Sequence, residues 1–141
     1  MKFLVIRKAD AETEAGVMPT AKIIDDMMAY NAKLVERGVM DSGAGLLPSS
    51  KGARVSFSGG KPTVIDGPFT EAKELVAGFS VVTASSLVKV IEMIKGWPQS
   101  DGGGNAQIEI RQIATAEDLA FSDEQQKRYD RMLEQEAAQQ Q

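Results

Sequence analysis

The charged residues best suited to chemistry gather in one short segment, residues 66–74. Asp66 and Glu71 supply carboxylates there, and Lys73 supplies a cation two residues after Glu71. In an extended segment Glu71 and Lys73 share one face, whereas a helical turn would align Glu71 with Glu74. A carboxylate beside a cation in a partly dry cleft can act as a general acid or base, or bind a charged metabolite. The alternative is a solvated ion pair worth less than about 1 kcal/mol.

The composition narrows the chemistry further. The chain has no cysteine and no histidine, which removes thiol nucleophiles, zinc sites of the Cys/His type and the usual base that titrates near neutrality. Catalysis, if present, depends on Asp, Glu, Lys, Arg, Tyr or Ser. No metal or cofactor is expected. We take Asp66, Glu71 and Lys73 as the candidate catalytic groups.

The same segment can instead be interpreted as a turn that has a structural role only. Asp66 is expected to end a strand and to accept hydrogen bonds from backbone N–H groups one to three residues further on, while Pro68 sets the turn and Gly67 relieves strain before it. Ligand contacts are expected from Arg7, which leaves a neighbouring strand, and from two residues of the segment, Phe69 and Glu74. The serine pair before Lys51 indicates a loop rather than a nucleophile with its base.

Hydrophobic patterning predicts the elements that position these residues. A continuous apolar run predicts a central strand, an amphipathic pattern followed by Gly38 predicts a helix, and alternating runs around a Gly-Gly turn predict a hairpin. Residues 11–18 lack a period and indicate a mobile loop, whereas glycines within two strands indicate bulges. The strands are expected at 3–6, 39–47, 54–57, 63–65, 75–82 and 106–111, the helices at 20–37 and 85–95, and a flexible turn at 100–104.

This order predicts an α+β, ferredoxin-like split βαβ fold with an added β-hairpin. Both helices would cover one face of the sheet, so a second copy of the chain is expected to cover the other face. Ser122 with Gln125 forms a capping-box pattern that begins a polar C-terminal helix. We therefore expect a domain at 1–114 and a helical extension at 115–141.

Charge and the N-terminus restrict partners and location. The formal net charge of −4 and the pI near 4.9 disfavour direct binding to nucleic acid. The start of the chain has four apolar residues before Arg7, too few for a signal peptide or a membrane span. The sequence thus predicts a cytoplasmic protein without membrane association.

The segment Asp66-Gly67-Pro68-Phe69-Thr70-Glu71-Ala72-Lys73-Glu74 resembles the DGPF signature of YciI-related proteins. The opening Met1-Lys2-Phe3-Leu4 and the Val76-Ala77-Gly78-Phe79 strand are similar to that family too, so the resemblance covers roughly residues 1–113. It implies a dimeric ferredoxin-like α/β barrel. Better-studied YciI relatives are thought to use a His–Asp pair, and that chemistry does not transfer to a chain without histidine.

Two functions from different classes follow from the resemblance and the charged segment. The first is a homodimer that binds a small polar metabolite in a cleft near the motif, with carboxylate/lysine acid–base chemistry at that site. The second is an interaction module without catalysis, such as an accessory to an extracytoplasmic-function sigma factor, with the polar tail as a docking helix. Convergence of the motif side chains in a pocket would favour the first.

Overall fold

The computed structural model describes residues 1–140, and its centre is a four-stranded antiparallel sheet. The strand order is β2-β5-β1-β6, and every neighbouring pair is antiparallel. With a helix after β1 and another after β5, this is the ferredoxin-like order that the sequence predicted. The strands are β1 (Lys2–Lys8), β2 (Met40–Gly45), β5 (Val76–Thr83) and β6 (Ile108–Gln112).

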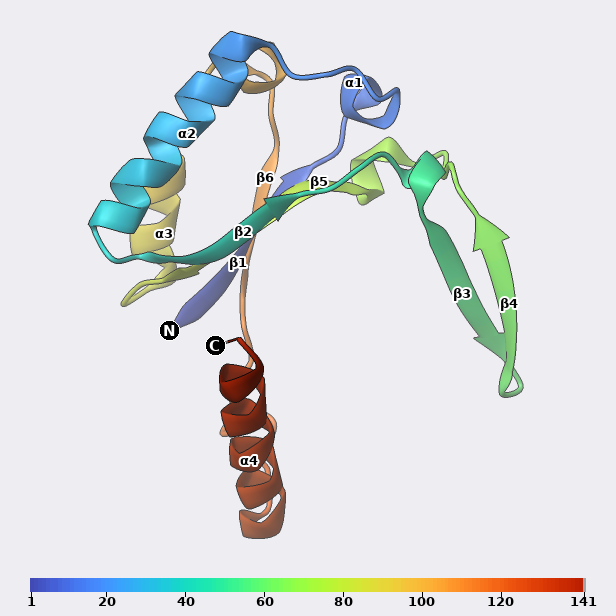
Figure 1. Cartoon of the computed structure of the whole chain (residues 1–141), viewed down its shortest axis with the longest axis vertical. Coiled ribbons are helices and arrows are strands. Elements are labelled where there is room, and N and C mark those ends of the chain that lie inside the picture. Colours follow the sequence, from blue (N-terminus) through green and yellow to red (C-terminus); the bar gives the residue numbers. More distant parts are fainter. Residues whose placement is uncertain (141) are drawn as a thin grey trace.

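Two helices, α2 (Ala21–Glu36) and α3 (Leu87–Ile94), lie on the same side of the sheet (Figure 1). Thr20 and Ser86 cap them by accepting hydrogen bonds from Ile23 N and Lys89 N, which satisfies backbone donors that a helix leaves free. The core under these helices consists of four fully buried side chains, Phe3, Val5, Val82 and Val90. Alternation along β1 places Leu4 and Ile6 on the opposite face of the sheet.

Short helical segments replace two predicted loops. Residues 11–18 were expected to be a mobile loop, but α1 (Ala11–Glu14) forms there because Asp10 and Thr13 close a reciprocal capping box. The predicted turn at 100–104 contains η3 (Asp101–Gly104), with left-handed backbone at Gly102 and Gly103. Two more single turns are η1 (Ser49–Lys51) and η2 (Ala72–Glu74).

The bulges lie one or two residues from the predicted glycines. Ala77 is left unpaired where Arg7 faces Gly78 and Lys8 faces Val76. Asp41 is skipped in the pairing of β2 with β5, although the expected bulge was at Gly43 or Gly45. Gly43 instead allows close packing, since a Cβ there would lie 3.1 Å from the carbonyl oxygen of Phe79.

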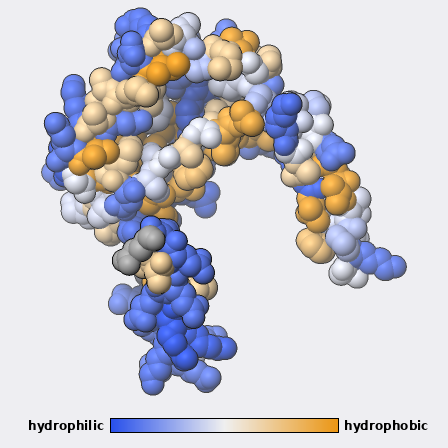
Figure 2. All heavy atoms as spheres, viewed as in Figure 1, coloured by the Kyte–Doolittle hydropathy of each residue, from blue (hydrophilic) through white to orange (hydrophobic). Residues whose placement is uncertain are grey.

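Two parts of the chain project from this domain (Figure 1). The predicted hairpin forms a separate two-stranded sheet of β3 (Ala53–Ser58) and β4 (Lys61–Asp66), and all of its residues are exposed. The predicted tail helix is α4 (Asp123–Gln139), begun by a capping box of Ser122 and Gln125. Figure 2 shows the resulting horseshoe, with apolar atoms along the inner side of the hairpin.

Within residues 1–140, no helix combines the length and the apolar character needed to cross a membrane.

Candidate functional site

Arg7, which is buried, forms a partly buried ion-pair cluster at the end of β1. Its Nε and Nη2 donate to the two carboxylate oxygens of Asp101, at 2.9 Å each, and Nη2 also donates to Asp10 Oδ2 at 3.1 Å. Nη1 donates to the carbonyl oxygen of Lys8. Arg7 is 9% exposed, although it belongs to a residue type that is seldom buried without partners. This fork geometry joins segments 94 residues apart in the sequence.

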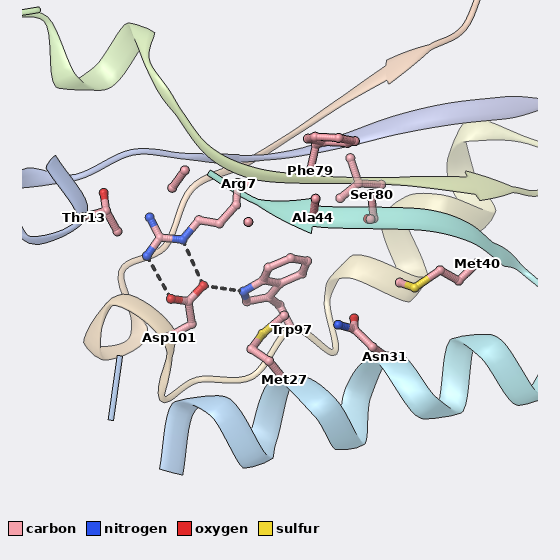
Figure 3. Close-up of a pocket in the computed structure, with 15 residues that line it drawn as sticks. Arg7, Thr13, Met27, Asn31, Met40, Ala44, Phe79, Ser80, Trp97 and Asp101 are labelled. Carbon is pink, nitrogen blue, oxygen red and sulfur yellow. Dashed lines mark hydrogen bonds and ion pairs between the residues drawn. The ribbon is translucent and has the colours of Figure 1, made fainter. Parts of the chain in front are cut away.

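Trp97 completes the cluster from the C-terminal end of α3. Its indole Nε1 donates to Asp101 Oδ2 at 2.9 Å, so that oxygen accepts from both Arg7 and Trp97 (Figure 3). The Trp97 ring packs against Tyr30 with centroids 5.6 Å apart, and the Tyr30 hydroxyl donates to the Met93 carbonyl at 2.8 Å. Helix α2 and the chain after α3 therefore hold Trp97 in position from both sides.

The electrostatics keep all three charged groups ionised. The hydrogen bond to Asp101 raises the pKa of Arg7 despite its burial. Burial by itself would raise the pKa of Asp101, but hydrogen bonds from Arg7 and Trp97 outweigh it and hold that pKa below its usual value. The Thr13 backbone N–H lowers the pKa of Asp10, with a further contribution from Arg7. Asp101 is thus a weak base with occupied oxygens.

A cavity of about 380 Å³ opens beside this cluster, between the sheet and α2. Figure 3 shows Arg7, Asp101 and Trp97 at one end, with Asn31 and Met27 approaching from α2. The sheet wall is made of small residues, including Gly43, Gly45 and Gly78. Phe79 points to the other side of the sheet (Figure 3). The size falls within the range of small-molecule sites.

Two polar side chains of the cavity wall are available to a ligand. Asn31 and Ser80 line the cavity, and neither side chain makes a hydrogen bond to another described residue. The rest of the wall is largely apolar, with Met27 and Met40 among its members. A few polar groups in an apolar wall is the usual composition of a small-molecule site.

The motif at residues 66–69 packs against η1 rather than forming a cleft of acids and bases. A Cβ on Gly67 would lie 1.8 Å from the Ser49 carbonyl oxygen, so glycine is required for this close approach. Ser49 Oγ donates to Glu14 and accepts from Phe69 N at 2.9 Å. The Arg54 guanidinium lies 3.9 Å from the centre of the Phe69 ring. These contacts connect α1, η1 and the base of the hairpin.

Several expectations for the segment therefore need correction. The Asp66 side chain forms no hydrogen bond within residues 1–140, because Ser49 Oγ accepts from the turn in its place. Gly67 is needed for space rather than to relieve strain. Glu71 and Glu74 are exposed, and neither pairs with Lys73 anywhere in the described part of the chain. The carboxylate–lysine pair considered for this segment is therefore not formed in the described part of the chain.

Arg7, Phe69 and Lys73 lie in three different places. Arg7 does line the main cavity, whereas Phe69 belongs to the base of the hairpin. Lys73 lines a different cavity, together with Lys8 and Arg7. Of the residues predicted for the site, Arg7 alone lines the main cavity among the described residues.

Sequence reasoning missed Asp101, which lies in a segment expected to be a flexible turn. Trp97 and Asn31 were not among the predicted site residues either. The one available signal was Arg7 itself, since a charged residue at an inward position of a central strand requires a buried partner. The alternation of Phe3, Val5 and Arg7 on one face contains that information.

The Arg7 cluster has few free carboxylate oxygens that could bind a metal ion. Within residues 1–140, no group of three or more acidic side chains is arranged as a metal-binding set. The oxygens of Asp10 and Asp101 are already occupied by Arg7, Thr13 and Trp97.

Comparison with known proteins gives a family. A solved structure, 5-chloro-2-hydroxyhydroquinone dehydrochlorinase from Burkholderia phenoliruptrix AC1100 in complex with 2,5-dihydroxybenzoquinone, is similar at 18% identity and a TM-score of 0.42, covering 83% of this chain and 98% of that one. An uncharacterized protein of Rhizobium meliloti (strain 1021) is 29% identical over 93 residues, which is 66% of this chain and 74% of the relative. The model of the YCII-related domain matches residues 1–123. The chain belongs to the YCII-related family.

Proposed function

We propose that this protein binds a small metabolite in the cavity between the sheet and α2. The observation that carries the proposal is the combination of a cavity of about 380 Å³ with a buried Arg7–Asp101–Trp97 cluster at its end. Buried ion pairs contribute little net stability compared with apolar packing. Their placement at the end of a hollow therefore favours a role in binding.

The ligand we expect is compact, without a full charge, and polar at one end. Arg7 and Asp101 neutralise each other, so neither is free to balance a ligand charge. Asn31 can donate and accept hydrogen bonds, and Ser80 can do the same through its hydroxyl. The methionines and the small residues of the sheet wall suit an apolar body.

Binding is better supported than acid–base catalysis. A general base works best with a pKa near the working pH, whereas that of Asp101 is lowered by its partners. The lysine and carboxylates of the motif do not meet at the main cavity. The motif at 66–69 supports placement in the DGPF branch of the family, which we propose on those residues alone.

Trp97 provides a direct test, because it is the one tryptophan of the chain and lines the cavity. A metabolite library is screened for compounds that raise the melting temperature. Each such compound is then titrated into the protein while tryptophan fluorescence is measured. We expect a saturable fluorescence change that Asn31→Leu weakens at least tenfold. Lys33→Leu, at an exposed position of the same helix, is the matched control. Binding would lie elsewhere if a compound from the screen kept its affinity in Asn31→Leu and did not change the fluorescence of Trp97.

We further propose that the protein is a homodimer. The sheet face opposite the helices presents Leu4, Ile6, Phe79 and Val81, with Phe79 37% exposed. The hairpin adds a second apolar face, because the opposed pairs Val55–Val64 and Phe57–Pro62 lie on one side of it. An isolated hairpin of this kind has little stability in water, so a partner surface is required.

Charge complementarity favours a second copy as that partner. The hairpin and its approach carry Lys51, Arg54 and Lys61, whereas α4 has more acidic than basic residues. Hairpin and α4 stand at the two ends of one horseshoe (Figure 2). Two copies related by a two-fold axis can therefore place each hairpin beside the other copy's α4.

Light scattering at micromolar concentration tests the dimer. We expect a dimer that buries more than about 1,000 Å² in total, and Phe79→Lys should convert it to monomers. Lys89→Met, on the helical side, is the control. A monomeric wild type would contradict the proposal and would leave the same surface for a different protein, as the sigma-factor alternative requires.

A further inference from the structure

A second cavity, which shares Arg7 with the main cavity, lies at the junction of β1 and η2. Its volume is about 340 Å³, and its polar lining includes Lys8, Lys73, Asn105 and Gln107. An adjoining depression shares Lys8, Lys73 and Gln107 with it. Two lysines from distant parts of the chain thus face the same hollow.

Backbone hydrogen bonds hold the two lysines near each other. The N–H of Lys8 donates to the Gln107 carbonyl oxygen at 2.9 Å, and the N–H of Ala9 donates to the Leu75 carbonyl oxygen at 2.9 Å. Leu75 follows η2 directly, and its own N–H bonds to the carbonyl oxygen of Ala72. Lys73 is therefore anchored beside the end of β1, and the cavity is part of the folded framework.

The charges around this cavity are unbalanced. Neither Lys8 nor Lys73 forms an ion pair or a side-chain hydrogen bond with any of residues 1–140. The one carboxylate of the lining, Asp10, is already held by Arg7 and the Thr13 N–H. In the adjoining depression, Glu109 lies 3.8 Å from Arg111. Two ammonium groups consequently share a hollow without a protein counter-ion.

We propose that this cavity binds an oxyanion, the phosphate or carboxylate group of a small molecule, between Lys8 and Lys73. Like charges facing one hollow repel each other, and an anion placed between them removes that cost. The Gln107 amide makes no side-chain hydrogen bond to a described residue and supplies a further N–H donor beside the lysines. The site contrasts with an overall formal charge of −4, which makes this local excess of cations distinctive.

This proposal does not depend on a ligand in the main cavity. Arg7 lines both cavities, but its guanidinium is committed to Asp101 and Asp10, and the two cavities share no other lining residue among those described. A solvated pair of lysines is the competing interpretation. It predicts weak attraction for any anion, whereas a site predicts saturation and dependence on these two residues.

The test uses the full chain and two probes, inorganic phosphate and acetate, titrated calorimetrically at constant ionic strength and pH 7.5. We expect saturable binding of at least one probe and at least a tenfold loss of affinity in the double variant Lys8→Met/Lys73→Met. The control is Lys33→Met/Lys89→Met, which removes the same charge from exposed, unpaired lysines elsewhere in the described chain. Its affinity should stay within twofold of the wild type.

The pattern of results decides both the proposal and its chemistry. Saturation by phosphate alone assigns the site to a phosphate group, and saturation by acetate that phosphate does not displace assigns it to a carboxylate. If Lys8→Met disturbs folding, Lys73→Met alone, at an exposed position, should still weaken binding several-fold. Non-saturating heats with both probes, or equal losses in the double variant and its control, would overturn the proposal.

Discussion

Two charged regions of this protein have opposite fates in the fold. Arg7 follows the apolar run of β1, yet it is buried and bonded to Asp101, Asp10 and a backbone carbonyl. Residues 66–74 concentrate charge in the sequence, yet their carboxylates are exposed and do not pair with Lys73. Charged residues that are close in sequence need not form pairs with each other. A charged residue on the buried face of a strand, in contrast, requires a partner, which here comes mainly from a distant part of the chain.

The largest expected effect comes from removing the buried cation. Arg7→Met should lower the free energy of unfolding by about 3–5 kcal/mol, because it leaves the partly buried Asp101 carboxylate without its partner. Lys73→Met, which removes an exposed cation of the motif, should change stability by less than about 0.5 kcal/mol. Urea unfolding at pH 7 measures both. Equal effects of the two substitutions would abolish the contrast between the regions.

Within the motif, spacing should matter more than charge. Gly67→Ala should cost about 1–3 kcal/mol, because the new Cβ would overlap the backbone oxygen of Ser49. Gly45→Ala is the matched control, since nothing lies within 4 Å of a Cβ at that position. Thermal unfolding of both variants measures the difference. A tolerated Gly67→Ala would show that the contact with η1 is dispensable.

The buried cluster should also make stability depend on pH. The pKa values of Asp101 and Asp10 are held below the ordinary 3.8, so their contribution is complete above that value and is lost as the pH falls through the lowered pKa. Asp101→Asn should cost about 2 kcal/mol at pH 7, because the charged acceptor of Arg7 is lost. Between pH 7 and pH 3 the variant should then lose less stability than the wild type in urea unfolding. Parallel curves would mean that Asp101 is not the titrating group.

The smallest effect is expected at the start of the motif. Asp66→Asn should change the free energy of unfolding by less than about 0.5 kcal/mol, because the exposed carboxylate makes no hydrogen bond to a described residue. Ser49→Ala is the comparison variant, because Ser49 Oγ accepts the hydrogen bond from Phe69 N. This substitution should lower the free energy of unfolding by about 1–2 kcal/mol. The two variants are compared by chemical unfolding at pH 7. A larger loss at Asp66 than at Ser49 would restore the original assignment of the turn.

Local patterning was sufficient for most of the fold. The apolar run of β1, the amphipathic period of α2, the hairpin turn and the capping signal at Ser122 are properties of neighbouring residues, and each predicted its element. The failures had local causes as well. The capping box of Asp10 and Thr13 lies in a polar stretch without hydrophobic period, so α1 was missed.

The sequence by itself determined the ferredoxin-like order, the amphipathic helices, the added hairpin and the absence of histidine and cysteine chemistry. It predicted Arg7 at the end of the first strand, whereas the structure extends β1 to Lys8 and buries Arg7. Tertiary structure alone decided that Asp101 and Trp97 meet Arg7, that Ser49 replaces Asp66 as the acceptor of the turn, and that Lys8 and Lys73 share a cavity. Such contacts join residues tens of positions apart. Their geometry depends on how strands pair and where short turns end, which no local spacing encodes.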